Sequence, residues 1–348
     1  MTSTDQHFLQ RCIQLALSAS RAVYPNPYVG SVIVHEGKII GEGFHEYSGG
    51  PHAEVNAVTS VKNPDLLPHS TIYVTLEPCS HFGKTPPCSD LILAKGIPRV
   101  VIGMQDPNPK VDGGGIKRLR DRGVEVVLAQ DPSPFEAINK VFLCNQLKKR
   151  PFIVLKWAQS ADGYIAGLDQ EGKGVSTSIS GTVAKRYVHR LRAFHKGIMV
   201  GKNTATIDNP SLTTRQFYGL SPIRLVWDKQ LSLPQHLNLF TDSGETWVLN
   251  EIKSEKEGTT KYLSFEDLTD LPHVVSSLYQ THKLSSILVE GGTNLLQQFL
   301  DFGLWDELHL IESSKSLGNG IKGPILPDMG IPDAQKKWGE DVVSVWNG

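Results

Sequence analysis

The sequence predicts an α/β fold built as two consecutive domains. Its 348 residues correspond to about two domains of ordinary size. In both halves, short apolar segments typical of strands alternate with amphipathic segments typical of helices, an order that produces sheets covered by helices. Between the halves, the basic segment 148–150 ends at Pro151 and precedes a new apolar strand. We therefore expect one domain over residues 1–147 and a second over residues 148–348.

The first half is predicted to begin with a helix and a hairpin. Apolar residues at helical spacing predict a helix over 8–20, which the prolines of Tyr24-Pro25-Asn26-Pro27 end. Two strands over 29–34 and 38–43 flank a tight turn. Further strands are expected at 70–76, 99–103 and 124–128, and helices at 52–61, 89–95, 115–122 and from 141 to the break. Cys12 and Cys144 lie on apolar helix faces and are expected in the core.

The second half repeats the alternation of strands and helices. Strands are expected at 152–157, 197–200, 223–227, 246–249, 287–290 and 307–311, and helices at 182–193 and 294–302. Gly291-Gly292 lies between a strand and a helix, where backbone N–H groups could bind a phosphate or glycine could simply allow the turn. The turn lacks the G-x-G-x-x-G motif of a Rossmann dinucleotide domain. The residues after about 312 receive no assigned role.

Composition and charge argue against several functional classes. The chain carries 35 Lys and Arg against 36 Asp and Glu, so it lacks the basic excess typical of nucleic-acid binding. It has no apolar stretch of the roughly 18 residues that a membrane span needs, and polar residues interrupt the N-terminal segment where a signal peptide would be apolar. Four cysteines are too few for a disulfide framework in a chain of this length. We expect a cytoplasmic protein that binds neither nucleic acid nor membranes.

The strongest chemical signal combines His52 and Glu54 with Cys79, which follows a proline, and Cys88. One histidine and two thiolates suit Zn²⁺ and leave a fourth tetrahedral position for water, as in catalytic zinc sites. Glu54 could then take a proton from that water and return it to a leaving group. Two alternatives remain: these residues could be ordinary core groups, or His81 could be a fourth ligand, which would make the site structural.

This pattern resembles the zinc deaminases, whose signature is H-x-E followed by P-C-x-x-C. Eight residues separate Cys79 from Cys88 here, so ordinary nucleoside, tRNA and DNA deaminases fit poorly. The longer segment 75–88 resembles the deaminase domain of the bifunctional riboflavin-biosynthesis deaminase/reductases, as do 25–30, 50–58 and 106–109. The resemblance implies a cytidine-deaminase-like, three-layer α/β/α domain in which Asn26 and His45 contact substrate. Asn26 could instead only shape the turn, while His45 and Lys84 could be solvated loop residues.

Segments 155–166, 200–215 and 289–292 resemble the reductase domain of the same family, which implies a dihydrofolate-reductase-like α/β fold and NADPH. Carried over by position, the cofactor residues are Ala158, Ser178, Thr204, Asp208, Gly291, Gly292, Thr293, Asn294, Leu295 and Leu296, with Asp208 also catalytic. The substrate residues are Lys156, Ser176, Arg192, Leu212, Arg215 and Glu290. Both arginines could hold a phosphate bidentately.

Some of the residues in this second half could have a purely structural role. Arg192 shares its helix with Arg186 and Arg190 and could belong to a solvated face. Asp162 and Asp208 stand in sequences typical of turns. Two features depart from the family: the connection over 167–174 is long, and Ser178 replaces an aromatic residue that often packs near the nicotinamide.

The resemblance covers nearly the whole chain and implies two consecutive reactions. The first is zinc-dependent hydrolytic deamination of 2,5-diamino-6-ribosylamino-4(3H)-pyrimidinone 5′-phosphate. The second is NADPH-dependent reduction of the ribosyl group to ribityl, giving 5-amino-6-ribitylamino-uracil 5′-phosphate. Two other functions stay open: an RNA or free-nucleobase deaminase with an accessory domain, and a zinc-stabilised binding protein. The expected partners are small phosphorylated pyrimidines, and a homo-oligomer is possible.

Overall fold

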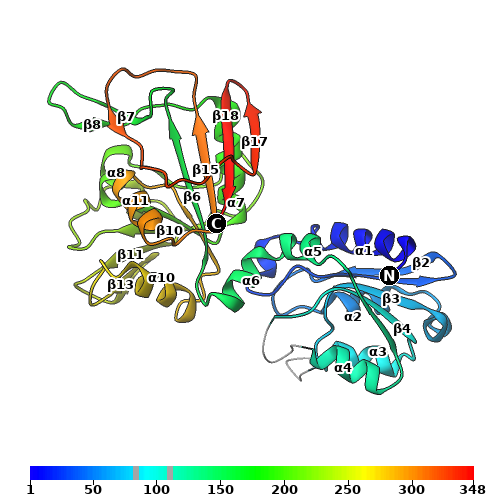
Figure 1. The fold of residues 1–348 in the computed structure, drawn as a ribbon. Coiled ribbons are helices and arrows are strands. Elements are labelled where there is room, and N and C mark those ends of the chain that lie inside the picture. Colours follow the sequence, from blue (N-terminus) through cyan, green and yellow to red (C-terminus); the bar gives the residue numbers. More distant parts are fainter. Residues whose placement is uncertain (81–85, 108–112) are drawn as a thin grey trace. The chain divides into compact units, whose positions relative to one another are not determined.

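The computed structural model describes residues 1–80, 86–107 and 113–348 (Figure 1). It divides into two compact units, Met1–Lys149 and Arg150–Gly348, each described by itself below. The division falls within the basic segment that ends at Pro151. Among the described residues, none of the helices is long and apolar enough to cross a membrane.

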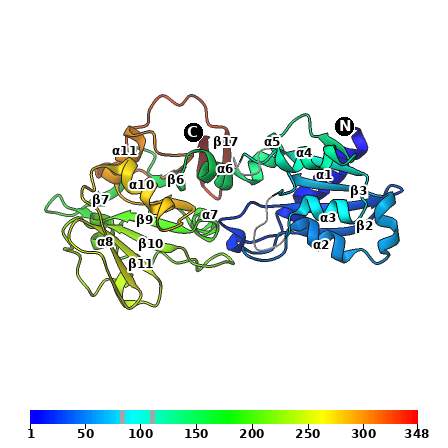
Figure 2. The same cartoon turned by 90° about the horizontal axis from the view of Figure 1, so that it is seen from below.

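Unit 1 is a sheet between two layers of helices, in agreement with the predicted α/β/α fold (Figures 1 and 2). Its described residues form five strands in the order β2-β1-β3-β4-β5, in which β1 is antiparallel to both neighbours and β3, β4 and β5 are parallel. The strands are β1 (Gly30–His35), β2 (Lys38–Phe44), β3 (Thr71–Leu76), β4 (Arg99–Met104) and β5 (Glu125–Leu128).

The helices of unit 1 cover both faces of this sheet. Helices α1 (Ser3–Ala16) and α5 (Ser133–Ile138) lie on one face, and α2 (Ala53–Ser60), α3 (Cys88–Ala94) and α4 (Gly114–Asp121) lie on the other. Helix α6 (Lys140–Leu147) follows α5, and the 3-10 turns η1 (Arg21–Val23) and η2 (Pro64–His69) lie in the connections. Cys12 and Cys144 are buried, which confirms their predicted place in the core.

Helix α1 corrects the predicted helix over 8–20 at both ends. It begins earlier because Thr2 and Asp5 form a capping box, in which each side chain accepts the backbone N–H of the other residue. It stops at Ala16 because Ser20 starts a separate turn, where its hydroxyl accepts the N–H of Ala22. The spacing of apolar residues therefore did not mark the ends of this helix, which the polar capping residues determine.

Two glycines let helices approach the sheet closely in unit 1. A Cβ at Gly30 would lie 2.0 Å from the carbonyl oxygen of Cys12, and one at Gly43 would lie 2.4 Å from the backbone nitrogen of Ala57. Side chains at these positions would push α1 and α2 away from the sheet. The second approach matters for function, because α2 carries Glu54 in its first turn.

Unit 2, all of whose residues are described, contains a mostly parallel ten-stranded sheet. The order is β12-β13-β11-β10-β9-β14-β6-β15-β18-β17, in which the outer strands β12, β18 and β17 pair in antiparallel fashion. The strands are β6 (Phe152–Gln159), β9 (Gly197–Gly201), β10 (Ile223–Trp227), β11 (Thr246–Asn250), β12 (Glu255–Glu257), β13 (Thr260–Ser264), β14 (Ser286–Val289), β15 (Glu307–Glu312), β17 (Ala334–Trp338) and β18 (Asp341–Asn347).

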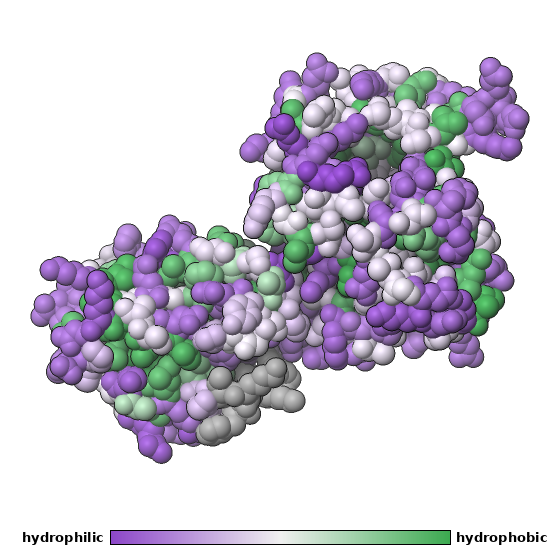
Figure 3. Space-filling model, turned by 180° about the vertical axis from the view of Figure 1, so that it is seen from behind, coloured by the Kyte–Doolittle hydropathy of each residue, from purple (hydrophilic) through white to green (hydrophobic). Residues whose placement is uncertain are grey.

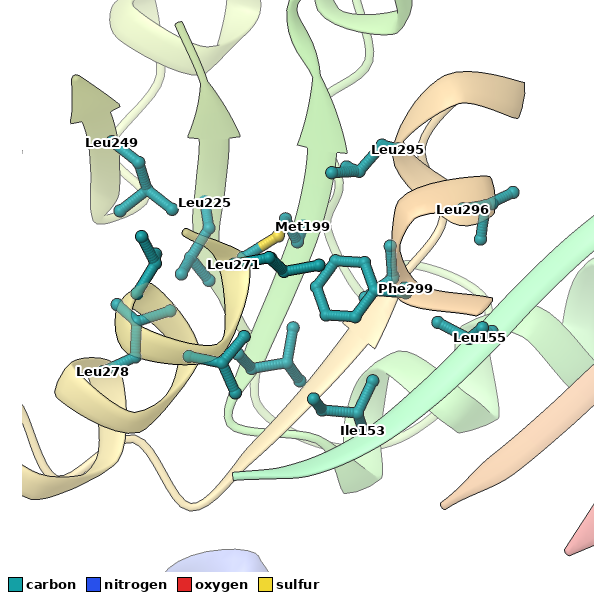
Figure 4. Close-up of a cluster of buried hydrophobic side chains, with 14 of the residues drawn as sticks. Ile153, Leu155, Met199, Leu225, Leu249, Leu271, Leu278, Leu295, Leu296 and Phe299 are labelled. Atoms are coloured by element: carbon teal, nitrogen blue, oxygen red, sulfur yellow. The ribbon is translucent and has the colours of Figure 1, made fainter. Parts of the chain in front are cut away.

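Helices pack on both faces of this sheet. Helices α10 (Leu271–Gln280) and α11 (Thr293–Asp301) form the main core with the strands. Figure 4 shows Phe299 of α11 in the middle of this cluster, next to Met199 of β9. On the other face α7 (Thr182–Phe194) packs against Ile311 and Val343. The short helices α8 (Lys202–Asp208) and α9 (Asn238–Thr241) lie in the connections after β9 and β10. This architecture agrees with the predicted reductase-type α/β fold.

Several elements of unit 2 escaped the sequence analysis. The clearest are α8, α10 and the strands after residue 312, of which β18 pairs along the whole of β15. A small sheet of β16 (Ile321–Lys322), β7 (Tyr164–Leu168) and β8 (Gly174–Val175) includes part of the long connection. Asp162 anchors it as a turn residue, since its carboxylate accepts the N–H groups of Leu317 and Gly318 at 3.1 and 2.7 Å. On the face drawn in Figure 3, hydrophilic residues predominate and hydrophobic ones gather in small groups.

Candidate active sites

The predicted zinc ligands of unit 1 lie together at two helix starts and in one loop. His52 is the N-cap of α2, Cys88 is the first residue of α3, and Cys79 lies in the loop after β3. The His52 Nδ1 atom is 3.6 Å from the Cys79 Sγ atom and 3.3 Å from the Cys88 Sγ atom. Ligand atoms about 2.0 to 2.3 Å from a tetrahedral zinc are themselves about 3.3 to 3.8 Å apart. The donor set and its spacing therefore fit zinc.

Electrostatics prepare the cluster for a cation. The hydrogen bond with the Cys88 thiol, together with His52, lowers the pKa of Cys79 to about 4. The same hydrogen bond and burial raise the pKa of Cys88. Helix α3 supports a negative charge on Cys79, because the Cys88 N–H donates to the Cys79 sulfur at 3.3 Å.

Glu54 lies beside the cluster in a buried environment. It is the second residue of α2, two positions after His52, and its carboxyl group contacts Cys88. Burial raises the pKa of Glu54 to about 7, although the charge of His52 opposes the shift. A carboxyl group in this position can exchange protons near neutral pH, as general acid and base catalysis requires.

Asn26 and His45 are hydrogen-bonded to each other, and His45 lies next to the candidate zinc ligand His52. The His45 Nδ1 atom donates to the Pro51 carbonyl at 2.8 Å, which leaves Nε2 to accept from the Asn26 amide at 2.9 Å. Burial lowers the pKa of His45 and so favours this neutral ring. The rings of His45 and His52 lie edge to face with centroids 5.6 Å apart. His45 is thus a buried residue of the site, and the solvated interpretation is wrong.

Glu77, which the sequence analysis did not select, supports the loop that carries Cys79. Its two carboxylate oxygens accept backbone N–H groups from two segments of the chain. The donors are Asp106 at 3.3 Å, Gly113 at 3.1 Å, Gly115 at 2.9 Å and Ile116 at 3.1 Å. The only local signal was its position directly before Pro78-Cys79. His81 and Lys84 lie outside the described residues, as do Asn108 and Pro109 of the family segment 106–109, so the fourth-ligand alternative stays open.

We expect Glu77→Gln to destabilise unit 1 by about 2 to 4 kcal/mol, because an uncharged amide cannot serve the buried N–H groups that the carboxylate serves. Urea unfolding followed by deaminase activity measures the loss. The matched control is Glu136→Gln at an exposed position of α5, expected within about 0.5 kcal/mol of wild type. Equal unfolding midpoints for the two variants would contradict the prediction.

In unit 2, three of the predicted substrate residues form one buried charge cluster. The Arg192 guanidinium donates to both carboxylate oxygens of Glu290, at 3.0 and 2.8 Å, and the Lys156 amine lies 3.8 Å from the same carboxylate. Burial opposes ionisation of Glu290, but the two cations hold its pKa at about 2. Arg186 and Arg190 are exposed, whereas Arg192 is largely buried; the solvated-face interpretation of Arg192 is therefore wrong.

Leu212 and Arg215 lie in the segment 212–215 that α7 holds next to this cluster. Arg192 donates to the Thr213 carbonyl at 3.3 Å, and the His189 ring accepts the Arg215 N–H at 3.1 Å. Leu212 is buried, whereas Arg215 is exposed. His189 was missed because its partner is 26 residues away in the sequence.

The predicted cofactor residues at the glycine turn come together with α8. The Thr204 hydroxyl accepts the N–H of Gly292 at 2.8 Å, and a Cβ at Gly291 would lie 2.6 Å from the backbone nitrogen of Gly201. Thr293 opens α11, Asn294 is exposed, and Leu295 and Leu296 belong to the core. The turn thus leads into the N-terminus of α11, a position typical of phosphate binding, although the Gly292 N–H itself is bound to Thr204.

The remaining predicted residues of unit 2 lie on other elements. Asp208 is exposed at the end of α8, and Ala158 is half-buried on β6. Ser176 and Ser178 are exposed in the segment after β8, where the Ser178 hydroxyl accepts a hydrogen bond from the Lys185 amine at 2.8 Å.

Comparison with known proteins identifies one family for each unit. Residues 2–104 match the family described as the cytidine and deoxycytidylate deaminase zinc-binding region, and residues 151–340 match the RibD C-terminal domain. The riboflavin biosynthesis protein RibD of Aquifex aeolicus is 35% identical, over 94% of this chain and 91% of that protein. The Escherichia coli protein of the same name is 37% identical, over 92% and 90%.

Solved structures give the same result. A diaminohydroxyphosphoribosylaminopyrimidine deaminase/5-amino-6-(5-phosphoribosylamino)uracil reductase from Thermotoga maritima superposes with a TM-score of 0.87 at 34% identity, covering 99% of this chain and 98% of that one. RibD from Acinetobacter baumannii gives 0.87 at 28% identity, with the same coverage. The chain therefore belongs to the RibD family of bifunctional riboflavin-biosynthesis deaminase/reductases, with a zinc-binding deaminase domain followed by a reductase domain.

Proposed function

We propose that unit 1 deaminates 2,5-diamino-6-ribosylamino-4(3H)-pyrimidinone 5′-phosphate and that unit 2 then reduces the ribosyl group with NADPH. The observation that carries the proposal is the cluster of His52, Cys79 and Cys88 with buried Glu54 beside it. The family, whose members combine both activities, supports the pairing with a reductase unit. A cytoplasmic location and a homo-oligomeric state remain predictions.

In the deaminase unit, His52, Cys79 and Cys88 would hold one zinc ion, which when bound supplies a Lewis acid that makes a water molecule nucleophilic near neutral pH. Glu54 takes a proton from the attacking water and delivers it to the ring nitrogen. It then transfers the remaining proton of the added hydroxyl group to the amino group, which leaves as ammonia while the carbonyl forms. Asn26, whose amide is oriented by His45, hydrogen-bonds the edge of the pyrimidine.

In the reductase unit, the turn over 291–296 and Thr204 would hold NADPH, which when bound supplies a hydride to the sugar carbon. Lys156 and Arg192 carry two positive charges against the one negative charge of Glu290, so the cluster attracts the sugar phosphate. Arg215, on the adjoining segment 212–215, adds a third positive charge. Glu290 orients the two buried cations and can accept hydrogen bonds from sugar hydroxyls. Cofactor contacts by Ala158 and Ser178, substrate contacts by Ser176 and Leu212, and the cofactor and catalytic roles of Asp208 stay predictions.

The test measures ammonia release and NADPH consumption together, on the purified full-length protein with the diaminopyrimidine substrate. We expect one NADPH oxidised for each ammonia released, with ammonia appearing first. Zinc removal by a chelator should stop ammonia release while NADPH oxidation continues with the already deaminated substrate. Failure of the zinc-loaded protein to release ammonia would exclude the deaminase assignment, and failure to oxidise NADPH with the deaminated substrate would exclude the reductase assignment.

A further inference from the structure

The segment 212–215 is attached to α7 by two side chains that lie one helical turn apart. His189 accepts the N–H of Arg215 at 3.1 Å, and Arg192 donates to the Thr213 carbonyl at 3.3 Å. Burial lowers the pKa of His189, which favours the neutral ring that can accept this bond. Arg192 uses its other nitrogens to hold Glu290. Thr213 is therefore connected through one guanidinium to the buried charge cluster of the reductase unit.

The hydroxyl group of Thr213 is shielded from solvent and has no hydrogen-bond partner among the described residues. The neighbouring Thr214 differs, because its hydroxyl donates to the Leu220 carbonyl at 3.5 Å. A buried hydroxyl without a partner costs the free protein stability, because the group has lost its hydrogen bonds to water. Such a group is expected where a ligand completes its hydrogen bonding.

The backbone next to Thr213 is also held in an unfavourable conformation. Leu212 is 3% exposed and has a φ of +52°, in the left-handed region that a leucine rarely adopts. Conformations of this kind persist where the surrounding contacts impose them, and they gather at binding sites. Here His189 and Arg192 supply those contacts on the segment that follows Leu212.

We propose that Thr213 is a substrate-binding residue of the reductase site, whose hydroxyl hydrogen-bonds an oxygen of the sugar phosphate. His189 and Arg192 are its positioning residues. A hydroxyl group both donates and accepts, so it pairs equally with a sugar hydroxyl and with a phosphate oxygen. This inference rests on the proposed reductase function and adds to it a contact that the motif residues do not include.

Thr213→Val in the full-length protein tests the assignment, because valine keeps the shape and removes only the hydroxyl. With the deaminated substrate and saturating NADPH, we expect KM to rise by about three- to tenfold, the value of one neutral hydrogen bond, with kcat within about twofold. The melting temperature should stay equal or rise, because an unpaired buried hydroxyl is removed. Thr213→Ser should restore the wild-type KM, and Thr214→Val is the matched control that should leave KM unchanged.

A second experiment distinguishes a phosphate oxygen from a sugar hydroxyl as the partner of Thr213. It uses inorganic phosphate as a competitive inhibitor. If Thr213→Val weakens inhibition by phosphate as much as it raises KM, the partner is the phosphate; unchanged inhibition with a raised KM assigns a sugar hydroxyl. An unchanged KM, an equal effect of Thr214→Val, or a lowered melting temperature would overturn the inference. A wild-type protein that does not oxidise NADPH with this substrate would instead overturn the proposed function, and the inference with it.

Discussion

Glu54→Gln is expected to lower the deaminase kcat by about 10²- to 10⁴-fold, because glutamine cannot carry the proton from water to the leaving ammonia. The amide has the same shape as the carboxyl group, and Glu54 is absent from the proposed ligand set of His52, Cys79 and Cys88. Zinc content should therefore match the wild type. The rate of ammonia release, with the metal content measured on the same sample, checks the prediction.

Two controls make this result specific to Glu54. Glu42→Gln removes a carboxylate of the same unit that pairs with Arg11 at 2.7 Å on a partly exposed surface, and it should change kcat by less than about twofold. NADPH oxidation with the deaminated substrate should be equal in all three proteins, which shows that unit 2 remains folded. Undiminished ammonia release by zinc-loaded Glu54→Gln would remove Glu54 from the mechanism.

Glu290→Gln is expected to reduce NADPH oxidation by about 100-fold or more and to destabilise unit 2 by about 3 to 5 kcal/mol. The substitution leaves the buried cations Lys156 and Arg192 beside each other without a counterion. The same change weakens the hydrogen bonds between Arg192 and residue 290, which orient the guanidinium toward the Thr213 carbonyl. Reductase kinetics and urea unfolding of unit 2 measure the two effects.

The acid dependence of stability gives an independent check on Glu290. Its pKa is about 2 in the folded protein against an ordinary value of 4.5, so ionisation stabilises the fold above about pH 4.5. This contribution is lost as the pH falls from about 4.5 to about 2, and the loss should be smaller in Glu290→Gln. Glu171→Gln, in an exposed pair with Lys173, should follow the wild-type curve. Superimposable curves for wild type and Glu290→Gln would contradict the buried ion cluster.

The sequence alone predicted the two α/β units, most strands and the metal cluster. Strands such as β10 could be predicted because apolar runs and turns are properties of neighbouring residues. The cluster of candidate zinc ligands could be predicted because the chemistry of imidazole and thiolate is local, and the structure places His52 and Cys88 at helix starts. The sites in unit 2 were assigned by resemblance, and the structure brings Lys156, Arg192 and Glu290 together.

Other features were decided only when distant parts of the chain met. Glu77 accepts hydrogen bonds from donors up to 39 residues away, and β18 extends the sheet by pairing with β15. The local sequence around Glu77 and β15 therefore gives no pattern from which these distant partners could be predicted.

The sequence by itself determined which chemical groups this protein has, because side-chain type, helix starts and apolar period are encoded locally. Only the tertiary structure decided which buried polar groups have partners. It pairs Arg192 with Glu290 and surrounds the Thr213 hydroxyl with groups that do not bond it. The physical reason is that satisfying a buried polar group depends on the few atoms within hydrogen-bond distance, and long-range closure of the chain chooses those atoms.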